Sequence, residues 1–382
     1  MDGDGDPGNA GRPLRSGLRL FLCGDVMTGR GIDQVLPHPC GPGLYEPYVH
    51  DARRYLELAE EVNGAIPRPA GFDYVWGDAL AELEARRPDA RIINLETSVT
   101  TSSRPWPKSI NYRMHPRNLP CLAAAGIDAC ALANNHVLDW GRQGLCETLN
   151  VLEAAHIASA GAGANARDAM TPAAVPLDRK ARLLLFSAAT GDSGVPRDWG
   201  ARAHRVGVNR LPDLSERTVD RLARHVEACR RPGDRVVFSL HWGGNWGFRV
   251  LPEQRRFAHS LVERAGVDVV HGHSSHHVKG LEVHRGRLIL YGCGDLVNDY
   301  EGIGGYAHYR GDLRLMYFPL LDRRDGSLLE LSLVPTRMRR FRIERAPDRD
   351  REWLLNTLRR ECARLDSATP EPAADGALRL VP

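Results

Sequence analysis

Residues 269–277 read VVHGHSSHH, so that four histidines follow directly on a short apolar segment. The apolar segment predicts a buried β-strand, and the histidines then stand at the end of that strand. Imidazole is a common neutral metal ligand and the side chain whose ordinary pKa lies nearest to 7. This stretch therefore predicts a metal or proton-transfer site at a strand end, with a surface loop as the alternative.

Four more apolar, strand-like segments end in polar groups of the same kinds. They are 18–23 before Asp25, 92–93 before Asn94 and Glu96, 127–133 before Asn134, Asn135, His136 and Asp139, and 236–240 before His241. Each has an ordinary alternative, since Gly-Asp forms turns, Asn satisfies loop backbones, and a buried histidine is often merely hydrogen-bonded. Open α/β sheets bind ligands at the carboxyl ends of their strands. Five such ends together favour a metal centre assembled from neighbouring strands.

Between these motifs the chain alternates helical and strand patterns, which predicts an α/β fold. Apolar residues at helical spacing predict helices at 51–62, 77–87, 116–125, 143–155, 214–229, 253–265 and 351–365. Further strands are predicted at 181–188, 287–291, 314–320 and 328–335. We expect one domain over residues 18–365. Residues 1–17 and 366–382 are rich in Gly, Pro, Ala or Asp, and we expect both ends to be disordered.

The composition excludes several classes of function. A chain of 382 residues with 42% hydrophobic residues can bury a large core, and its net charge of +3 gives no argument for nucleic acid binding. Residues 1–17 contain no apolar segment of a signal peptide or membrane anchor, so we expect a cytoplasmic protein without a membrane partner. None of the eight cysteines forms a CxxC motif, and we expect them to be small buried side chains. The oligomeric state is not predicted.

Taken in order, the motifs GDVMTGR, NLET, NNHVLDWG, LHWG, GHSSHH and YGCGD resemble those of the CapA-type proteins. These proteins are named for poly-γ-glutamate capsule synthesis and belong to the calcineurin-like metallophosphoesterase superfamily. The resemblance covers about residues 18–320 and implies a four-layer α/β/β/α sandwich with a metal site at the strand ends. It also implies a role in acid–base chemistry for His136, and metal ligation by Asp25, Glu96, Asn135, His241, His273 and His276.

Some positions depart from the superfamily pattern. Met27 stands where superfamily phosphatases usually have a metal-binding histidine, and a thioether binds hard cations poorly. Glu96 replaces the bridging aspartate, and the last histidine pair is spaced GHSSH. These departures favour one firmly held divalent ion over a two-metal clamp. We expect Ca²⁺, because several of the implied ligands offer oxygen, with Mn²⁺, Zn²⁺ and Fe²⁺ as alternatives.

Two carboxylates are predicted to form couples with histidines. Asp295 in YGCGD stands where the CapA-type pattern commonly has asparagine, and a carboxylate beside His276 or His273 would raise imidazole basicity and fix its tautomer. Asp139 is predicted to act in the same way on His136. Two couples on opposite sides of a metal suit removal of a proton from one face of a carbon and its return to the other. The alternative is that Asp295 caps a turn and Asp139 begins a helix.

Aromatic residues flank the motif loops and suggest an apolar wall for a bulky substrate. We interpret Trp242, Trp246 and Arg30 as candidate substrate-binding residues, with packing beneath the loops as the alternative.

The sequence leaves three functions open. Our main hypothesis is a metal-dependent epimerase that inverts the C-terminal residue of a lasso-peptide precursor, because the CapA-type resemblance includes a soluble branch with that activity. A precursor peptide would then be the partner. The first alternative is a metallophosphoesterase-type hydrolase, against which Met27 counts. The second is a poly-γ-glutamate capsule biosynthesis protein, which an expected cytoplasmic location disfavours.

Overall fold

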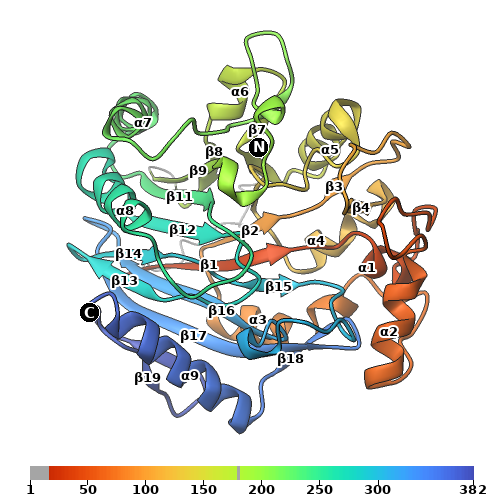
Figure 1. Cartoon of the computed structure of the whole chain (residues 1–382). Coiled ribbons are helices and arrows are strands. Elements are labelled where there is room, and N and C mark those ends of the chain that lie inside the picture. The colour runs from red at the N-terminus through yellow and green to blue at the C-terminus, as the bar shows by residue number, and fades with distance from the viewer. Residues whose placement is uncertain (1–16, 179–180) are drawn as a thin grey trace, which may run out of the picture.

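Strand β1 (Gly17–Val26) is apolar on both of its faces, which explains its place in the middle of the molecule. Leu20 and Leu22 pack into one hydrophobic core, while the intervening Phe21 and Cys23 pack into another. A strand that is buried on both faces needs a further layer on each side. The computed structural model, which describes residues 17–178 and 181–382, supplies these layers (Figure 1).

The helices fall in the regions where the sequence has helical periodicity, apart from short turns that the pattern does not predict. They are α1 Gly31–Val35, α2 Arg53–Asn63, α3 Asp78–Arg86, α4 Pro120–Ala124, α5 Gly141–Ala154, α6 Ala166–Met170, α7 Glu216–Cys229, α8 Pro252–Ala265 and α9 Asp348–Ala363. The predicted helix 116–125 is in fact a 3₁₀ turn, Pro116–Asn118, followed by α4, because Pro120 lacks the backbone N–H that a continuous helix would use.

Most strands belong to two large sheets. The first ten are β1, β2 Ala90–Leu95, β3 Ser98–Val99, β4 Arg113–Met114, β5 Ala129–Ala131, β6 Ala158–Ala160, β7 Ala162–Gly163, β8 Ala173–Pro176, β9 Arg182–Ala189 and β10 Gly207–Val208. The others are β11 Arg235–His241, β12 Val269–His273, β13 Leu281–His284, β14 Arg287–Leu290, β15 Asp295–Val297, β16 Leu313–Asp322, β17 Leu328–Arg339, β18 Arg342–Arg345, β19 Glu371–Pro372 and β20 Leu378–Leu380.

The larger sheet has the strand order β19-β20-β17-β16-β1-β2-β5-β6, with β15 paired to β1 and β18 to β17. The second sheet has the order β13-β14-β12-β11-β9-β8. In the first sheet, β1, β2, β5, β6 and β15 are parallel neighbours, and in the second, β9, β11, β12 and β14 are parallel. Parallel strands deliver their carboxyl ends to one edge of a sheet, which is where the polar motifs of the sequence stand.

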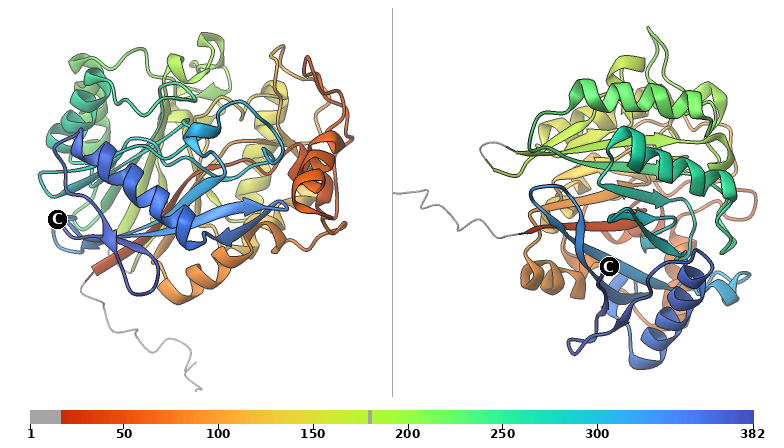
Figure 2. Two further views of the ribbon diagram at one scale, coloured as in Figure 1. Left: turned by 60° about the horizontal axis from the view of Figure 1, so that its bottom comes forward. Right: turned by 90° about the vertical axis from the view of Figure 1, so that its left-hand side faces the viewer.

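The layers follow from three hydrophobic cores. One core lies between the sheets and combines Leu22 of β1 with Leu185 of β9 and Val237 of β11. A second covers the outer face of the larger sheet with residues of α3 and α5, and a third covers the outer face of the smaller sheet with residues of α7 and α8. The arrangement is the four-layer α/β/β/α sandwich that the sequence predicts (Figure 2).

The C-terminal segment differs from the prediction of a disordered tail over residues 366–382. Strand β20 pairs antiparallel with β17 at Leu331↔Leu380 and Leu333↔Leu378. Leu378 and Leu380 are each 1% exposed and belong to the core between the sheets. The segment is polar and proline-rich on average, but its two leucines have the strand period of two and cover an otherwise exposed sheet edge.

Further expectations concern the N-terminal extension, the cysteines and membrane-spanning helices. Residues 1–16 of the extension predicted to be disordered lie outside the described residues, and Gly17 already belongs to β1. Six of the eight cysteines are buried, as expected, whereas Cys146 is exposed and Cys229 is half-buried, and all eight are free thiols. Within 17–178 and 181–382, no helix combines the length and apolarity needed to span a membrane.

Truncation of Leu380 tests the packing of the tail. Leu380→Ala should lower the free energy of unfolding by ~2–4 kcal/mol, because it removes a buried side chain from the core between the sheets. The matched control is Leu329→Ala on β17, where the side chain is 39% exposed and the loss should be within about 1 kcal/mol. Urea denaturation of both variants measures the difference. Equal stabilities of Leu380→Ala and the unchanged protein would mean that the tail does not pack.

Candidate metal centre

The strand ends of both sheets meet at one place. In the larger sheet, Asp25 of β1 is level with Asn94 of β2 and with Asp295 of β15. In the smaller sheet, His241 of β11 is level with His273 of β12. The gap between the sheets is bridged at this point, since Oδ1 of Asp25 lies 3.7 Å from Nδ1 of His273.

Gly24 allows the backbone of β1 to lie in contact with Gly294, the residue just before β15. A Cβ atom on Gly24 would lie 1.6 Å from the backbone oxygen of Gly294, so no other residue fits here without movement of the backbone. The next residue, Asp25, donates its backbone N–H to the same Gly294 oxygen over 3.0 Å. Each residue of the Gly-Asp pair therefore has a structural role. Gly24 permits the contact between the two backbones, and the side chain of Asp25 lies in the centre.

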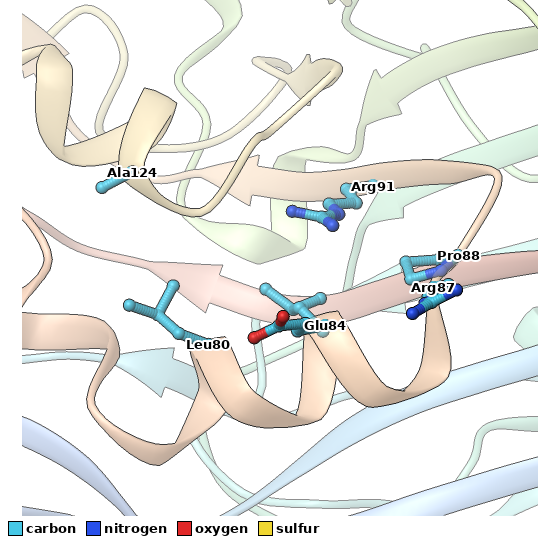
Figure 3. Close-up of a pocket in the computed structure, with 7 residues that line it drawn as sticks. Leu80, Glu84, Arg87, Pro88, Arg91 and Ala124 are labelled. Atoms are coloured by element: carbon cyan, nitrogen blue, oxygen red, sulfur yellow. The ribbon is translucent and has the colours of Figure 1, made fainter.

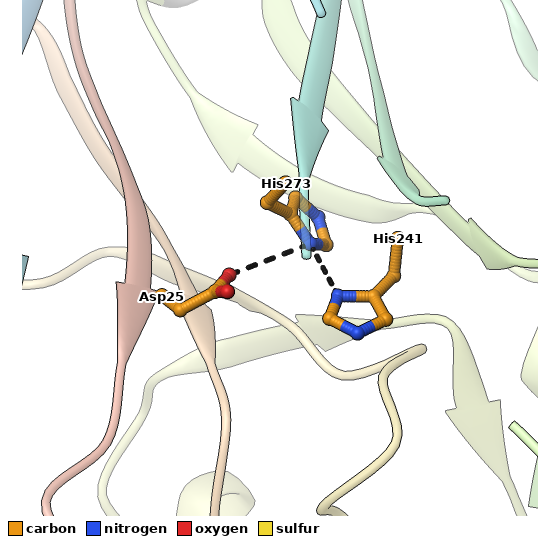
Figure 4. Close-up of side chains that lie close together, drawn as sticks. All are labelled: Asp25, His241 and His273. Carbon is orange, nitrogen blue, oxygen red and sulfur yellow. Dashed lines mark hydrogen bonds and ion pairs between the residues drawn. The ribbon is translucent and has the colours of Figure 1, made fainter. Parts of the chain in front are cut away.

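Asp25, His241 and His273 form the heart of the candidate centre (Figure 4). All three are fully buried, and one nitrogen or oxygen atom from each lies within 4.8 Å of the others. Nδ1 of His241 and Nδ1 of His273 are 2.8 Å apart. Burial lowers the pKa of both histidines well below 6.5, which keeps the imidazoles neutral and able to bind a metal ion.

Glu96 adds a second buried carboxylate beside Asp25. Its Oε2 lies 3.8 Å from Nδ1 of His241, and the Asn94 amide donates to both Glu96 and Asp25 over 2.9 and 2.7 Å. Burial raises the pKa of Asp25 to about 7, with a further contribution from the Asp295 carboxylate. Burial and the Asp25 carboxylate raise the pKa of Glu96 well above its ordinary value. Two buried carboxylates in contact favour a nearby cation.

Two polar atoms of this cluster, Oδ2 of Asp25 and Nε2 of His241, are buried and without a hydrogen-bond partner, and the same holds for Oδ1 of Asn135 in the loop after β5. Buried polar groups are nearly always paired, so unpaired ones need an explanation. A divalent ion would take oxygen from the carboxylate and the amide and nitrogen from an imidazole. The residues present therefore fit a divalent metal, as the sequence predicts.

A hydrogen-bonded chain runs from His273 toward the backbone of β1. Nε2 of His273 lies 2.7 Å from Oγ of Ser239, which lies 3.2 Å from Nδ1 of His271. Nε2 of His271 lies 2.7 Å from the carbonyl oxygen of Cys23. All four residues are buried.

His136 and Asp139 form the first of the two predicted couples. Nδ1 of His136 lies 2.6 Å from Oδ2 of Asp139, and because a carboxylate can only accept, Nδ1 carries the proton. Nε2 of His136 then faces Oε1 of Glu96 at 3.9 Å with a free lone pair. Burial lowers the pKa of His136 to about 4, although Asp139 acts in the opposite direction. The ring is therefore a neutral base at pH 7.

His276 and Asp295 form the second couple, with Nδ1 of His276 2.9 Å from Oδ1 of Asp295. Burial alone would lower the pKa of His276, but the Asp295 carboxylate outweighs it, and the pKa is raised above 6.5. The Asn298 amide donates to the other oxygen of Asp295 over 2.7 Å and holds that carboxylate in place. His276, Asp25 and Asp295 also offer atoms within 4.8 Å of one another, so the position of His276 is compatible with ligation as well.

Both predicted couples are thus present as contacts, and neither aspartate has the alternative role considered for it. Helix α5 begins at Gly141, two residues after Asp139, and Asp139 does not cap it. Asp139 instead accepts a hydrogen bond from the backbone N–H of Tyr112 over 2.6 Å. Asp295 begins strand β15 and does not lie in a turn.

Lys108 is a site residue that the sequence analysis did not identify. Its Nζ lies 2.6 Å from Oδ1 of Asp139 and 3.2 Å from Nδ1 of His136, and it also donates to the carbonyl of Asn135. The side chain is 23% exposed, whereas His136 is almost wholly buried. Lys108 lies in an irregular segment with no apolar periodicity and no recognisable motif, so only the tertiary structure reveals it.

Two of the three predicted substrate-binding residues have other roles. Trp242 is 2% exposed, stacks on Tyr291 with ring centroids 6.1 Å apart, and donates from Nε1 to the Tyr291 carbonyl. It is a core residue. Arg30 is 3% exposed and binds Asp299 in a bidentate pair at 2.6 and 2.8 Å, with Glu46 at 3.0 Å. Its charge is paired inside the protein, which counts against Arg30 as a substrate anchor, although its role in substrate binding stays a prediction.

Trp246 remains a candidate for substrate contact. Its ring lies 5.6 Å from that of His276 and stacks on Tyr306 at 4.3 Å. Tyr306 is 52% exposed, so this pair forms an aromatic surface that leads from solvent to the second couple.

A surface hollow elsewhere does not belong to this centre. It has a volume of about 460 Å³ and is lined by Leu80, Leu83, Glu84, Arg87, Pro88, Arg91 and Ala124 (Figure 3). Arg91 lies at the start of β2, whereas the candidate metal centre lies beyond the end of that strand.

A third group of potential ligands, His259, Glu282 and His284, lies away from the centre on α8 and β13. The two oxygens of Glu282 are already bound by Arg255 at 2.9 Å and by the hydroxyl of Tyr291 at 2.7 Å. The imidazoles of His259 and His284 are stacked face to face at 3.7 Å. These contacts explain the cluster as an ordinary ion-pair network.

Comparison with known proteins gives a consistent result. The family described as bacterial capsule synthesis protein PGA_cap matches residues 19–300. A probable polyglutamine synthesis accessory protein of Mycobacterium tuberculosis strain H37Rv is 48% identical over 345 residues, which are 90% of each chain. The capsule biosynthesis protein CapA of Bacillus anthracis is 24% identical over 83% of this chain and 67% of its own. The PGA biosynthesis protein CapA of Bacillus subtilis is 26% identical over 74% of this chain and 63% of its own.

Removal of central ligands tests the metal site. Asp25→Asn and His273→Ala should each weaken binding of a divalent metal by more than ~100-fold, because loss of a ligand costs more than loss of an outer partner. The control is His225→Ala on α7, where the imidazole contacts the Met170 carbonyl far from the centre. Elemental analysis of purified, dialysed proteins gives the metal content, and circular dichroism confirms folding. Full occupancy in both ligand variants would contradict the assignment of the centre.

Proposed function

Because this chain belongs to the bacterial capsule synthesis protein PGA_cap family, we propose that it is a metal-dependent enzyme that hydrolyses amide bonds of a glutamate or glutamine polymer during polymer synthesis. The names of its relatives and the chemistry of the candidate centre support this function together. The polymer takes the place of the lasso-peptide precursor as the expected partner.

The observation that supports this proposal best is the buried cluster of Asp25, His241 and His273, in which Oδ2 of Asp25 and Nε2 of His241 have no hydrogen-bond partner, together with the two His/Asp couples beside it. Buried polar groups are nearly always paired, and a simple binding module would not need two histidines paired with aspartates beside one cluster. The arrangement has the components of acyl-transfer chemistry at a carbonyl group.

A bound divalent metal would supply Lewis-acid polarisation of the amide carbonyl. The protein residues supply the proton transfers. His136 is neutral, with Nε2 free on the side of the centre, and is placed to take a proton from an attacking water molecule. Asp295 raises the pKa of His276, which favours the protonated imidazole, and this side chain is placed to give a proton to the leaving amine. Lys108 is partly exposed and would attract the carboxylates of an acidic chain.

The ligands favour a metal that accepts both nitrogen and oxygen. Two imidazoles, from His241 and His273, stand beside the Asp25 carboxylate. Ca²⁺ prefers oxygen ligands only, whereas Zn²⁺, Fe²⁺ and Mn²⁺ are commonly bound by imidazole together with carboxylate. We therefore propose one of these three ions in place of the Ca²⁺ that the sequence alone favours.

The first test is hydrolysis of poly-γ-glutamate. Purified protein with Mn²⁺, Zn²⁺ or Fe²⁺ should shorten the polymer, as measured by size-exclusion chromatography, and a chelator should stop the reaction. His136→Ala should lower the rate by ~10²–10⁴-fold while retaining the metal, because it removes the base and no ligand. His225→Ala should react like the unchanged protein. A polymer of constant length with every metal would contradict hydrolysis as the function.

Inversion of a Cα centre is a second candidate, and one observation favours it specifically. The two couples meet the centre from different loops, with His136 following β5 and His276 following β12, and the pKa of His136 is lowered whereas that of His276 is raised. A base on one side and an acid on the other are what an epimerase needs to remove and return a proton. A peptide with an accessible C-terminal residue would then be the substrate.

Incubation in D₂O separates this candidate from hydrolysis. An epimerase should introduce deuterium at a Cα position without shortening the chain, as detected by mass spectrometry and chiral amino-acid analysis. Asp295→Asn should lower this exchange by ~10²–10⁴-fold, since the carboxylate charge that raises the pKa of His276 is lost. Asp322→Asn, at the far end of β16, is the matched control. Undiminished exchange in Asp295→Asn would remove the second couple from the mechanism.

A phosphoesterase has less support from the structure. Met27, at the position of the usual histidine ligand, is fully buried and its sulfur lies 3.7 Å from the Tyr300 hydroxyl. The thioether is therefore held away from any role as a ligand to a hard cation.

A further inference from the structure

The chain of contacts behind His273 has only one consistent set of proton positions when its histidines are neutral. It begins at the Cys23 carbonyl oxygen, which can only accept, so Nε2 of His271, at 2.7 Å, must carry a proton. Both partners of the His271 ring are uncharged groups, the Cys23 carbonyl and the Ser239 hydroxyl. A neutral imidazole has one N–H, and Nδ1 of His271 is therefore an acceptor.

The next contacts follow from the first. The Ser239 hydroxyl has a single proton and donates it to Nδ1 of His271 over 3.2 Å. Its oxygen is then available to accept from Nε2 of His273 over 2.7 Å. With the proton of His273 on Nε2, its Nδ1 is an acceptor; this atom lies 3.7 Å from Oδ1 of Asp25 and accepts a hydrogen bond from Nδ1 of His241 over 2.8 Å.

We propose that Ser239 and His271 are positioning residues that fix His273 in the Nε2–H tautomer and so present its Nδ1 to the metal. Neither residue touches the ion or the substrate. The hydrogen bonds run from the Cys23 carbonyl oxygen in the larger sheet, through His271 and Ser239 in the smaller sheet, to the proposed ligand His273. The proposal deepens the metal-dependent function proposed above, but it concerns metal affinity alone and holds for either reaction.

The same hydrogen bonds connect the two sheets. Cys23 lies on β1, whereas Ser239 lies on β11 and His271 on β12. All are buried, so an unpaired ring nitrogen or hydroxyl here would cost free energy. The same hydrogen bonds therefore fix the distance between the sheets and the direction of a ligand. Outer hydrogen bonds of this kind are known to set the tautomer and orientation of metal-binding histidines.

The first experiment measures affinity for Zn²⁺ alone by competition with a chromogenic chelator, without any substrate. Ser239→Ala should bind Zn²⁺ ~10–100-fold more weakly, since His273 loses its acceptor. His271→Phe, which preserves shape but removes both ring nitrogens, should show a loss in the same range. Ser239→Thr keeps the hydroxyl and should restore most of the affinity. Unchanged affinity in Ser239→Ala would overturn the proposal, whatever the enzyme's reaction proves to be.

The matched control is Ser332→Ala on β17. Ser332 is also a buried strand serine, and its hydroxyl accepts a hydrogen bond from Arg86 over 2.8 Å in the larger sheet. This variant should bind Zn²⁺ like the unchanged protein. An equal loss of affinity in Ser332→Ala would show that any buried hydroxyl deletion has this effect, and would overturn a specific role for Ser239.

The second experiment needs no variant at Ser239 and so does not depend on the folding of one. Nitrogen-15 chemical shifts of the imidazoles in metal-free, unchanged protein report which ring nitrogen carries the proton, and a His273→Asn sample assigns the signal. We expect the proton on Nε2 in both His271 and His273. A proton on Nδ1 of His273 would contradict the proposal directly.

Discussion

The structure depends on the burial of two carboxylates, Asp25 and Glu96, beside one another at the ends of parallel strands. Each is at most 1% exposed, and burial raises both pKa values. The cost of holding two such groups in a dry interior is offset only by hydrogen bonds and a nearby cation. Asn94 supplies hydrogen bonds to both, and the unpaired atoms around them leave room for the cation. The rest of the centre is arranged around this requirement.

The four-layer fold explains how such a centre can be both buried and reachable. Parallel strands of two facing sheets end at the same level, so a ligand from β1 meets ligands from β11 and β12 across the gap. The ligands themselves are fully covered. The loops that follow the strands bring His136 and His276, which are 6% and 7% exposed, to the outer side of the centre. The chemistry is therefore expected on the loop side, while the sheets provide rigidity.

The similarity to capsule and polyglutamine synthesis proteins and the geometry of the centre both support the metal-dependent function that we propose for this chain. The family match covers most of the motifs, and the relative that is 48% identical spans nearly the whole chain. The geometry adds a buried cluster of Asp25, His241 and His273 that is compatible with a divalent metal, with two His/Asp contacts beside it. Met27 directly follows β1, the strand that carries Asp25, and its sulfur lies 3.7 Å from the Tyr300 hydroxyl, while the two imidazoles of the cluster come from β11 and β12.

Local sequence pattern was sufficient for the fold class and for most of the site. Strand and helix periods, and polar residues directly after apolar segments, are properties of neighbouring residues, and parallel strands then bring Asp25 and His273 to one edge. Contacts between distant segments decided the positions of Lys108 and of the C-terminal strand, and the burial of Trp242. Lys108 meets Asp139 only through the path of an irregular loop, and Leu380 packs only because β17 offers an open edge. Trp242 stands next to a ligand in sequence, yet strand alternation turns its ring into the core.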